Sequence, residues 1–503
     1  MEASTDGLTL VDWVLIGCYA LGAIGLGYYY SRKQRSTEEY FIGSGHMNPT
    51  LIGFSLFATL LSTISYLSMP GEAIGKGPTG LYGLLALPLI YLVVGYGLIP
   101  VYMRRHVTST YELLEERMGL GIRLLGAILF IVLRLVWMSL LVYLSARAMA
   151  VMLGVGTGWI PVIALFTGFV AVIYTSLGGL RAVVITDFCQ TMLMLGGAVL
   201  VITMVSIDLG GFGWFPTSWH SNWDVQPVFS FDPGTRLTVF GLVLSSLVWY
   251  VCTSGGDQTV VQRFMATADA EAARRSLRTQ LVVAAIIGTT LSFVGFALLG
   301  YFQVHDQALP PGLSVSETAD QIFPHFISFH LPPGVSGLVV AAMFAAAMSS
   351  IDSGVNSISA VVMSDFLDRF GRRPESEKGH VRVAKLLAFG IGSVVVVGSS
   401  FMEHVPGNIT AVTAKTTNLL VTPIFALFFF ALFVPFARPA GAVVGAVCGI
   451  ATAALIAFSG PIFGMDPDTG LDPISFMWIG PTALVVNLLS GTLASLALRR
   501  FES

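Results

Sequence analysis

Residues 51–77 read LIGFSLFATLLSTISYLSMPGEAIGKG, an apolar run that passes into serines and threonines and then into Pro70-Gly71. Residues 242–258 read LVLSSLVWYVCTSGGDQ and change in the same way at Thr253–Asp257. A break of this kind inside a membrane frees backbone carbonyls, which are tolerated only where protein or a watery cavity surrounds them. We therefore interpret both stretches as interrupted transmembrane helices that help to build a site.

The composition places the chain in a membrane. Of its 503 residues, 54% are hydrophobic and 11% are charged, whereas a soluble domain has about 25% charged residues. Apolar runs of roughly 20 residues, long enough to cross a bilayer as helices, recur along the whole length. The four cysteines fall inside such runs and show no disulfide or zinc spacing. The sequence predicts an all-α, multi-pass protein of the cell membrane (a plasma membrane or a bacterial inner membrane) with the lipid bilayer as its partner.

The apolar runs and the positive charges together predict the topology. We expect about 13 spans, near residues 9–30, 48–70, 79–103, 120–153, 158–176, 184–207, 236–255, 279–302, 334–364, 386–402, 409–434, 440–459 and 474–498. Most of the 26 Lys and Arg residues fall in the connections of one side. Because positive charges stay in the cytoplasm, the N-terminus is predicted outside and the C-terminus inside.

The two interrupted spans lie five spans apart. This spacing is typical of a five-plus-five inverted repeat, in which unwound carbonyls coordinate Na⁺ near the middle of the membrane. Two ordinary Pro/Gly kinks would explain the same pattern, since such residues are common in transmembrane helices. The spacing alone leaves both interpretations open.

A third stretch, residues 345–357, is a predicted buried helix with an unusual number of polar side chains. Ser349, Ser350 and Ser353 share one face by helical spacing, and Asp352 follows Ser349 by one turn. A cluster of oxygen ligands without His or Cys suits a hard cation. Serine hydroxyls that join two helices are the common alternative, but they do not explain a carboxylate at this depth. A second carboxylate, Asp187, begins the sixth span.

Three motifs resemble signatures of the sodium:solute symporter family: YTSLGGLRAVVITDFCQ (174–190), DQTVVQRFMATAD (257–269) and MSSIDSGVNS (348–357). The resemblance covers nearly the whole chain. It implies a LeuT-like core of ten helices, here spans two to eleven, and secondary active Na⁺-coupled symport by alternating access. The single transporter domain, 1–503, would then comprise the first span and a cytoplasmic loop (1–47), two inverted repeats (48–207 and 236–434) and two C-terminal spans (435–503).

The resemblance also implies the ion sites. The common Na⁺ site of the family maps onto the carbonyls of Ala58 and Leu61, the carbonyl of Ala346, and the hydroxyls of Ser349 and Ser350. A second cation site found in some members maps onto Asp187, Asp352 and Ser353. Where the family pattern has Ser, this chain has Asp352, which could strengthen that site, move it, or bind a proton instead.

The substrate is expected between spans two, three, four, seven and eleven. The polar residues of sugar-transporting relatives are missing at the matching positions (Leu60, Ser65 and roughly Leu84), which argues against a hexose. Our candidate substrate-binding residues are Phe57, Ser62, Ser65, Tyr66, Arg134, Trp137, Trp249, Tyr250, Ser254 and Lys415. The aromatic members could equally be packing residues.

Arg134 lies near the middle of the fourth span, where an arginine is a functional candidate and its planar fork suits a carboxylate. We therefore favour a small organic anion, either a monocarboxylate or an acidic sugar. Two structural alternatives stay open: Arg134 could pair with Glu72 or Asp352, and Lys415 could reach outward to the interface.

Other functions are weighed against symport of an anion. A symporter of a neutral sugar, polyol or amino acid is the first alternative. A passive channel is disfavoured because no selectivity filter or charge ring is evident, and a membrane sensor because the chain continues only briefly after the last span. We expect no enzyme, no cofactor besides Na⁺, no nucleic acid and no obligate protein partner, since no nucleophile–base set or nucleotide-binding loop is present.

Overall fold

A computed structural model describes residues 8–32, 36–61, 63–104, 107–221, 223, 227–305, 309, 315, 318–402, 409–465 and 472–500. All regular elements in these ranges are helical. The first half contains α1 (Leu10–Ser31), α2 (Thr37–Ile42), α3 (Pro49–Leu60), α4 (Thr63–Lys76), α5 (Leu87–Leu92), α6 (Ile99–Tyr102), α7 (Glu112–Met118), α8 (Leu120–Met152) and α9 (Ile160–Asp208). The second half contains α10 (Val239–Gly256), α11 (Gln258–Met265), α12 (Ala270–Val304), α13 (Ala319–Phe329), α14 (Val335–Val361), α15 (Glu377–Ser399), α16 (Ile409–Phe433), α17 (Pro439–Ala457), α18 (Ser459–Phe463) and α19 (Ile479–Arg500).

Ten helical segments of the described chain are long and apolar enough to cross a membrane, and two shorter apolar helices accompany them. One of the ten includes α9, which covers two of the expected spans. The two are joined at Gly179, where φ is +62° and ψ is −173°. Only glycine adopts this conformation readily, so the helix direction changes there without strain. The predicted all-α membrane architecture is confirmed, whereas the total of about 13 spans and the orientation of the termini stay predictions.

Both predicted interruptions are present. The helix α3 ends at Leu60, and Leu61 is extended (φ −83°, ψ 121°) before α4 begins. The first break therefore precedes Pro70, which lies inside α4. In the second stretch Gly255 and Gly256 remain helical, and the chain turns at Asp257 (φ −92°, ψ 116°) between α10 and α11.

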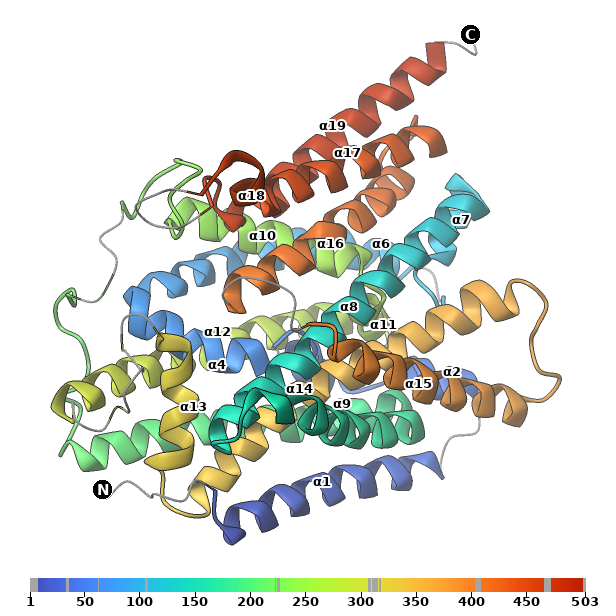
Figure 1. Ribbon diagram of the computed structural model, residues 1–503. Coiled ribbons are helices and arrows are strands. Elements are labelled where there is room, and N and C mark those ends of the chain that lie inside the picture. Colours follow the sequence, from blue (N-terminus) through green and yellow to red (C-terminus); the bar gives the residue numbers. More distant parts are fainter. Residues whose placement is uncertain are drawn as a thin grey trace.

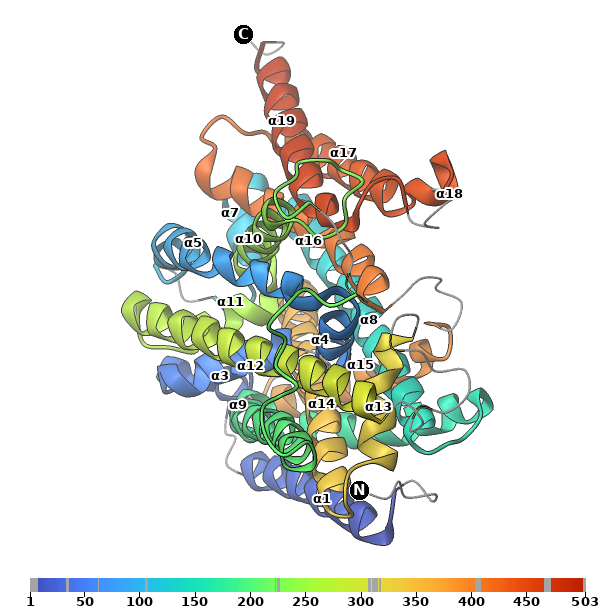
Figure 2. The same cartoon turned by 90° about the vertical axis from the view of Figure 1, so that its left-hand side faces the viewer.

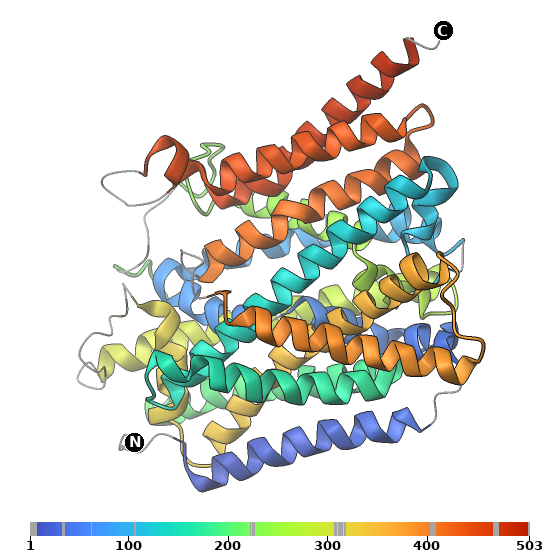
Figure 3. The same cartoon turned by 45° about the vertical axis from the view of Figure 1, so that its right-hand side comes forward.

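The helix α14 occupies the centre of the bundle, and almost all of its residues are buried (Figure 1). It packs against α9, α1, α8 and the broken pair α3–α4. A quarter turn of the molecule shows α1 on one side of α14 and the C-terminal helices α17 and α19 on the opposite side (Figure 2). The same order is visible from a third direction (Figure 3). A polar helix in this position contacts several elements at once.

The end of α10 is held tightly against α16. A methyl group added at Gly256 would lie 2.9 Å from the backbone nitrogen of Phe425, closer than side chains approach a backbone. The carbonyl of Gly256 also accepts a hydrogen bond of 3.0 Å from the Tyr111 hydroxyl. These contacts fix the place where the second interrupted helix breaks.

Asp320, in α13, lies outside the apolar spans and packs against Gly71 of α4. Burial raises the pKa of the Asp320 carboxyl to about 6, and the Glu72 carboxylate adds to the rise, while Arg236 and Arg147 oppose it. Because the folded state binds this proton more tightly than the unfolded chain, the stabilisation from protonated Asp320 is full below about pH 4 and is lost as the pH rises to about 6.

We expect Asp320→Asn to stabilise the protein at pH 7.5 by about 1–3 kcal/mol and to leave its stability at pH 4 nearly unchanged. The amide keeps the shape of the side chain but cannot ionise. Thermal unfolding in detergent between pH 4 and 8 measures the difference. The exposed Glu375→Gln serves as the control, and equal pH profiles for Asp320→Asn and the wild type would contradict the prediction.

Candidate cation and solute site

Five predicted ligands meet where α3 ends against the middle of α14. The Ser349 hydroxyl lies within hydrogen-bonding distance of the Ala58 carbonyl (2.9 Å) and the Ala346 carbonyl (3.0 Å) and can donate its proton to either. The Ser350 hydroxyl points to the Leu61 carbonyl at 3.4 Å. The α3 carbonyls are available because the last carbonyls of a helix have no partner within it. All five residues are buried. The group, which we name the α3–α14 oxygen cluster, contains only carbonyl and hydroxyl oxygens, the ligands of a hard cation.

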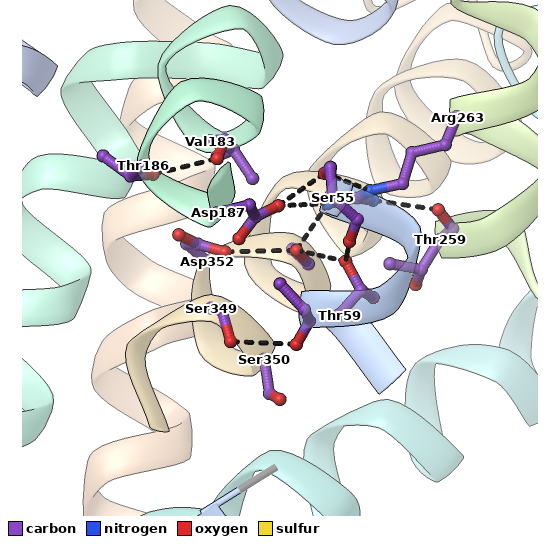
Figure 4. Close-up of polar contacts among 12 residues, drawn as sticks. Ser55, Thr59, Val183, Thr186, Asp187, Thr259, Arg263, Ser349, Ser350 and Asp352 are labelled. Carbon is purple, nitrogen blue, oxygen red and sulfur yellow. Dashed lines mark hydrogen bonds and ion pairs between the residues drawn. The ribbon is translucent and has the colours of Figure 1, made fainter. Parts of the chain in front are cut away.

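The predicted second cation ligands also lie together, beside the first cluster. Asp187 of α9 accepts a hydrogen bond of 2.5 Å from the Ser55 hydroxyl. Asp352 accepts from the Tyr174 hydroxyl and, at 3.1 Å, from Ser353. The Ser353 hydroxyl also contacts the Thr59 hydroxyl at 2.9 Å. Figure 4 shows Asp187 and Asp352 on one side of α3, with Ser349 and Ser350 a short way off.

A residue that sequence reasoning missed lies between these ligands. The guanidinium of Arg263, in α11, donates to Ser55 (2.8 Å) and Ser353 (2.5 Å) and lies 3.5 Å from a carboxylate oxygen of Asp187 (Figure 4). Its third bond, 2.9 Å long, goes to the Thr259 carbonyl of its own helix. By the span boundaries predicted from the sequence, Arg263 lies in the connection after the seventh span, and the structure shows that it is buried there, with 1% of it exposed. The available signal was its place six residues after the break at Asp257.

Arg134 forms a buried ion pair, and its partner is neither Glu72 nor Asp352, the two residues considered from the sequence. It pairs with Asp257, at the α10–α11 break, and neither residue is more than 5% exposed. The pairing with Glu72 is wrong because Glu72 binds Arg236 at 2.7 Å. The pairing with Asp352 is wrong as well, since that carboxylate is bound by hydroxyl groups.

A small cavity of about 30 Å³ lies beside this ion pair. It is lined by Thr59, Leu60, Leu133, Arg134, Trp137, Trp249, Thr253, Asp257, Thr417 and Val421. The lining comes from α3, α8, α10 and α16 together with the break. These helices belong to four of the five spans between which the substrate is predicted, and the third span contributes none of the described lining residues. The volume suits a water molecule. An organic solute therefore needs these helices to separate.

The cavity receives three of the predicted substrate residues, Arg134, Trp137 and Trp249. Phe57 and Tyr66 pack in a different apolar cluster, where the Tyr66 hydroxyl donates to the Met194 carbonyl at 3.3 Å. Tyr250 packs edge-on against Trp249. Neither Ser65 nor the buried Ser254 lines the cavity.

Two further predictions have different outcomes. Lys415 as a substrate ligand is wrong, because its ammonium group binds the Asp472 carboxylate at 2.5 Å and does not reach the cavity. Ser62 lies outside the described residues. Thr59, Thr253 and Thr417 were missed, although Thr59 and Thr253 closely precede the two breaks.

Comparison with known proteins gives consistent matches over most of the chain. Residues 40–449 match the profile of the sodium:solute symporter family. The sodium/sialic acid symporter SiaT of Proteus mirabilis is 28% identical, over 96% of this chain and 95% of its own. The sodium-coupled monocarboxylate transporter 1 of Mus musculus is also 28% identical, over 94% and 77%. A solved Na⁺-coupled sialic acid symporter, in a substrate-bound outward-open state, superposes with a TM-score of 0.81 at 27% identity, over 97% of this chain and 98% of that one.

Proposed function

The chain belongs to the sodium:solute symporter family and is a multi-pass, Na⁺-coupled transporter of the cell membrane, and on this basis we propose that it carries a small organic anion. The substrate we favour is a monocarboxylate or an acidic sugar such as a sialic acid. One observation carries the proposal: the buried Arg134 belongs to the lining of a small cavity beside the second broken helix. The two relatives named above transport sialic acid and monocarboxylates, both of which bear a carboxylate.

The α3–α14 oxygen cluster is the proposed Na⁺ site. Its ligands are Ala58, Leu61, Ala346, Ser349 and Ser350. A Na⁺ ion there would bridge the interrupted helix to the central helix and so favour one arrangement of the two. Substrate then binds beside the break, the outer side closes, and the inner side opens to release both. Residues 48–207 and 236–434 are the proposed inverted repeats, because each begins with an interrupted helix.

Asp187, Asp352 and Ser353 are proposed as a second cation site. Two carboxylates and one guanidinium leave a surplus negative charge in a buried cluster, which favours uptake of a cation. Arg263 already supplies one positive charge to these oxygens. A second ion therefore shares its ligands with a fixed side chain, which distinguishes this site from the first.

We expect Ser349→Ala to raise the Na⁺ concentration for half-maximal uptake by about 10- to 100-fold, since a ligand to a charged ion is worth about 1.5–3 kcal/mol. Uptake by proteoliposomes at graded Na⁺ measures it. Ser359→Ala is the matched control, because Ser359 is buried on the same helix and donates to the Val355 carbonyl of that helix (2.7 Å). An unchanged Na⁺ dependence of Ser349→Ala would remove Ser349 from the site.

A second candidate substrate class has an observation in its favour. Arg134 and Asp257 together are neutral, and the pair matches the two charges of a zwitterionic amino acid. The discriminating experiment is Na⁺-dependent uptake of radiolabelled N-acetylneuraminate, L-lactate, glucose and proline by proteoliposomes. Accumulation of an anion above its outside concentration supports the proposal. Accumulation of proline alone selects the second candidate, and equilibration without accumulation indicates a passive channel.

A further inference from the structure

Asp257 uses its two carboxylate oxygens for different tasks. One oxygen, Oδ1, accepts a hydrogen bond of 2.8 Å from the backbone amide of Thr259 and so caps the first turn of α11. The other, Oδ2, accepts from Nη2 of Arg134. The residue is 4% exposed, so both bonds lie within the protein. Asp257 therefore holds α11 and Arg134 at the same time.

The pairing leaves part of the Arg134 fork unused. Its buried Nε has no hydrogen-bond partner among the described residues. A guanidinium binds a carboxylate most strongly through two parallel bonds, one of which Nε can supply. Asp257 supplies Arg134 with one oxygen, and its second oxygen caps α11. An unmet donor in a buried position costs free energy, so the Arg134 site favours a ligand that satisfies both nitrogens.

Arg134, which carries this unused donor, belongs to the lining of the small cavity. Arg134 and Asp257 are the only charged residues that line it within the described parts of the chain. The Thr253 hydroxyl, also in the lining, likewise lacks a partner within those parts. A carboxylate that entered here would meet two donors that the protein leaves unsatisfied. This arrangement resembles an anion-binding site in which a carboxylate of the protein, Asp257, neutralises the Arg134 charge.

We propose that Asp257 is an internal competitor of the substrate: an incoming carboxylate replaces it on Arg134 by binding Nε and Nη2 together. This inference rests on the proposed anion transport and adds the residue that sets its selectivity. Once replaced, Asp257 still caps α11 through Oδ1. The exchange breaks the ion pair that joins α8 to the α10–α11 break. Substrate binding thereby allows the interrupted helix to move relative to α8. A neutral solute cannot perform it.

The test is Asp257→Asn. Asparagine is as good an N-cap as aspartate, so α11 keeps its start, while the competing charge is removed. We expect N-acetylneuraminate and L-lactate binding to tighten by at least about tenfold, since Arg134 then offers its charge without a rival. Quenching of the fluorescence of Trp137 and Trp249, which line the cavity, measures the affinity. Asp472→Asn, which breaks the ion pair of Lys415 away from the cavity, is the matched control and should leave affinity unchanged.

Arg134→Gln separates failure of this inference from failure of the proposed function. If Arg134→Gln loses anion binding but Asp257→Asn binds no tighter than the wild type, the exchange is overturned and the anion proposal stands. If neither substitution alters anion binding, or if neither anion binds the wild type, the exchange and the proposed anion transport are both overturned. Infrared difference spectra of the wild type with carbon-13-labelled N-acetylneuraminate do not depend on a variant that folds. A shift of the protein carboxylate band on substrate binding supports the exchange. A difference spectrum without any change in that band overturns it.

Discussion

Replacing Arg263 with glutamine is expected to lower the free energy of unfolding by about 3–5 kcal/mol and to abolish uptake. Removing one partner of a buried ion pair leaves the other charge uncompensated, here Asp187, which is fully buried. The guanidinium also joins α11 to Ser55 of α3 and to Ser353 of α14. Thermal unfolding in detergent and Na⁺-driven uptake measure the two effects.

Two further variants make this result specific. Arg278→Gln, at an exposed position of α12, removes an arginine without touching the cluster and should behave as wild type. Arg263→Lys keeps the charge but loses the planar fork, so its stability should lie between that of the wild type and that of Arg263→Gln. If Arg263→Gln unfolds at the wild-type temperature and transports normally, the guanidinium does not hold α11 against α3 and α14.

Arg134→Gln is expected to abolish uptake of an organic anion. The substitution removes the charge that binds the carboxylate and leaves Asp257 buried without its ion pair, which destabilises the protein by about 3–5 kcal/mol. Uptake of N-acetylneuraminate and L-lactate is measured on variant protein that elutes as the wild type does. Retained affinity for the anion in such folded protein would refute the role of Arg134.

The double variant Arg134→Gln/Asp257→Asn separates binding from stability. It removes both charges together, so much of the lost stability should return. Anion uptake should stay absent, because no cation remains in the cavity lining. Recovery of transport together with stability would mean that the ion pair serves only the fold.

The sequence predicted the elements that local chemistry determines. An apolar run interrupted by Ser, Gly and Pro cannot continue as an ordinary helix, and both interruptions are present. The helix spacing of Ser349 and Ser350 places both on one side of α14, and the break at Leu61 supplies carbonyls opposite them. Because each half of the α3–α14 oxygen cluster is local, the family resemblance was enough to predict their meeting.

The remaining features depend on how distant helices are rotated against one another. Arg134 and Asp257 are both visible in the sequence, but their pairing across α8 and the α10–α11 break follows from packing alone. The burial of Arg263 was hidden because α11 is short and polar, so no window of hydropathy marks it as buried. The prediction of Lys415 as a substrate ligand missed its ion pair for the same reason, since its partner Asp472 lies in a connection far along the chain.

The position of Arg263 has an electrical consequence. A Na⁺ ion crosses the membrane with the substrate, whereas a guanidinium attached to α11 stays in the protein through every cycle. One Na⁺ that travels with one monocarboxylate moves no net charge, so the membrane voltage performs no work on that cycle. Each additional Na⁺ would gain about 2.3 kcal/mol per 100 mV. The fixed charge of Arg263 therefore bears on what drives accumulation of the solute: the membrane voltage, or the Na⁺ concentration difference alone.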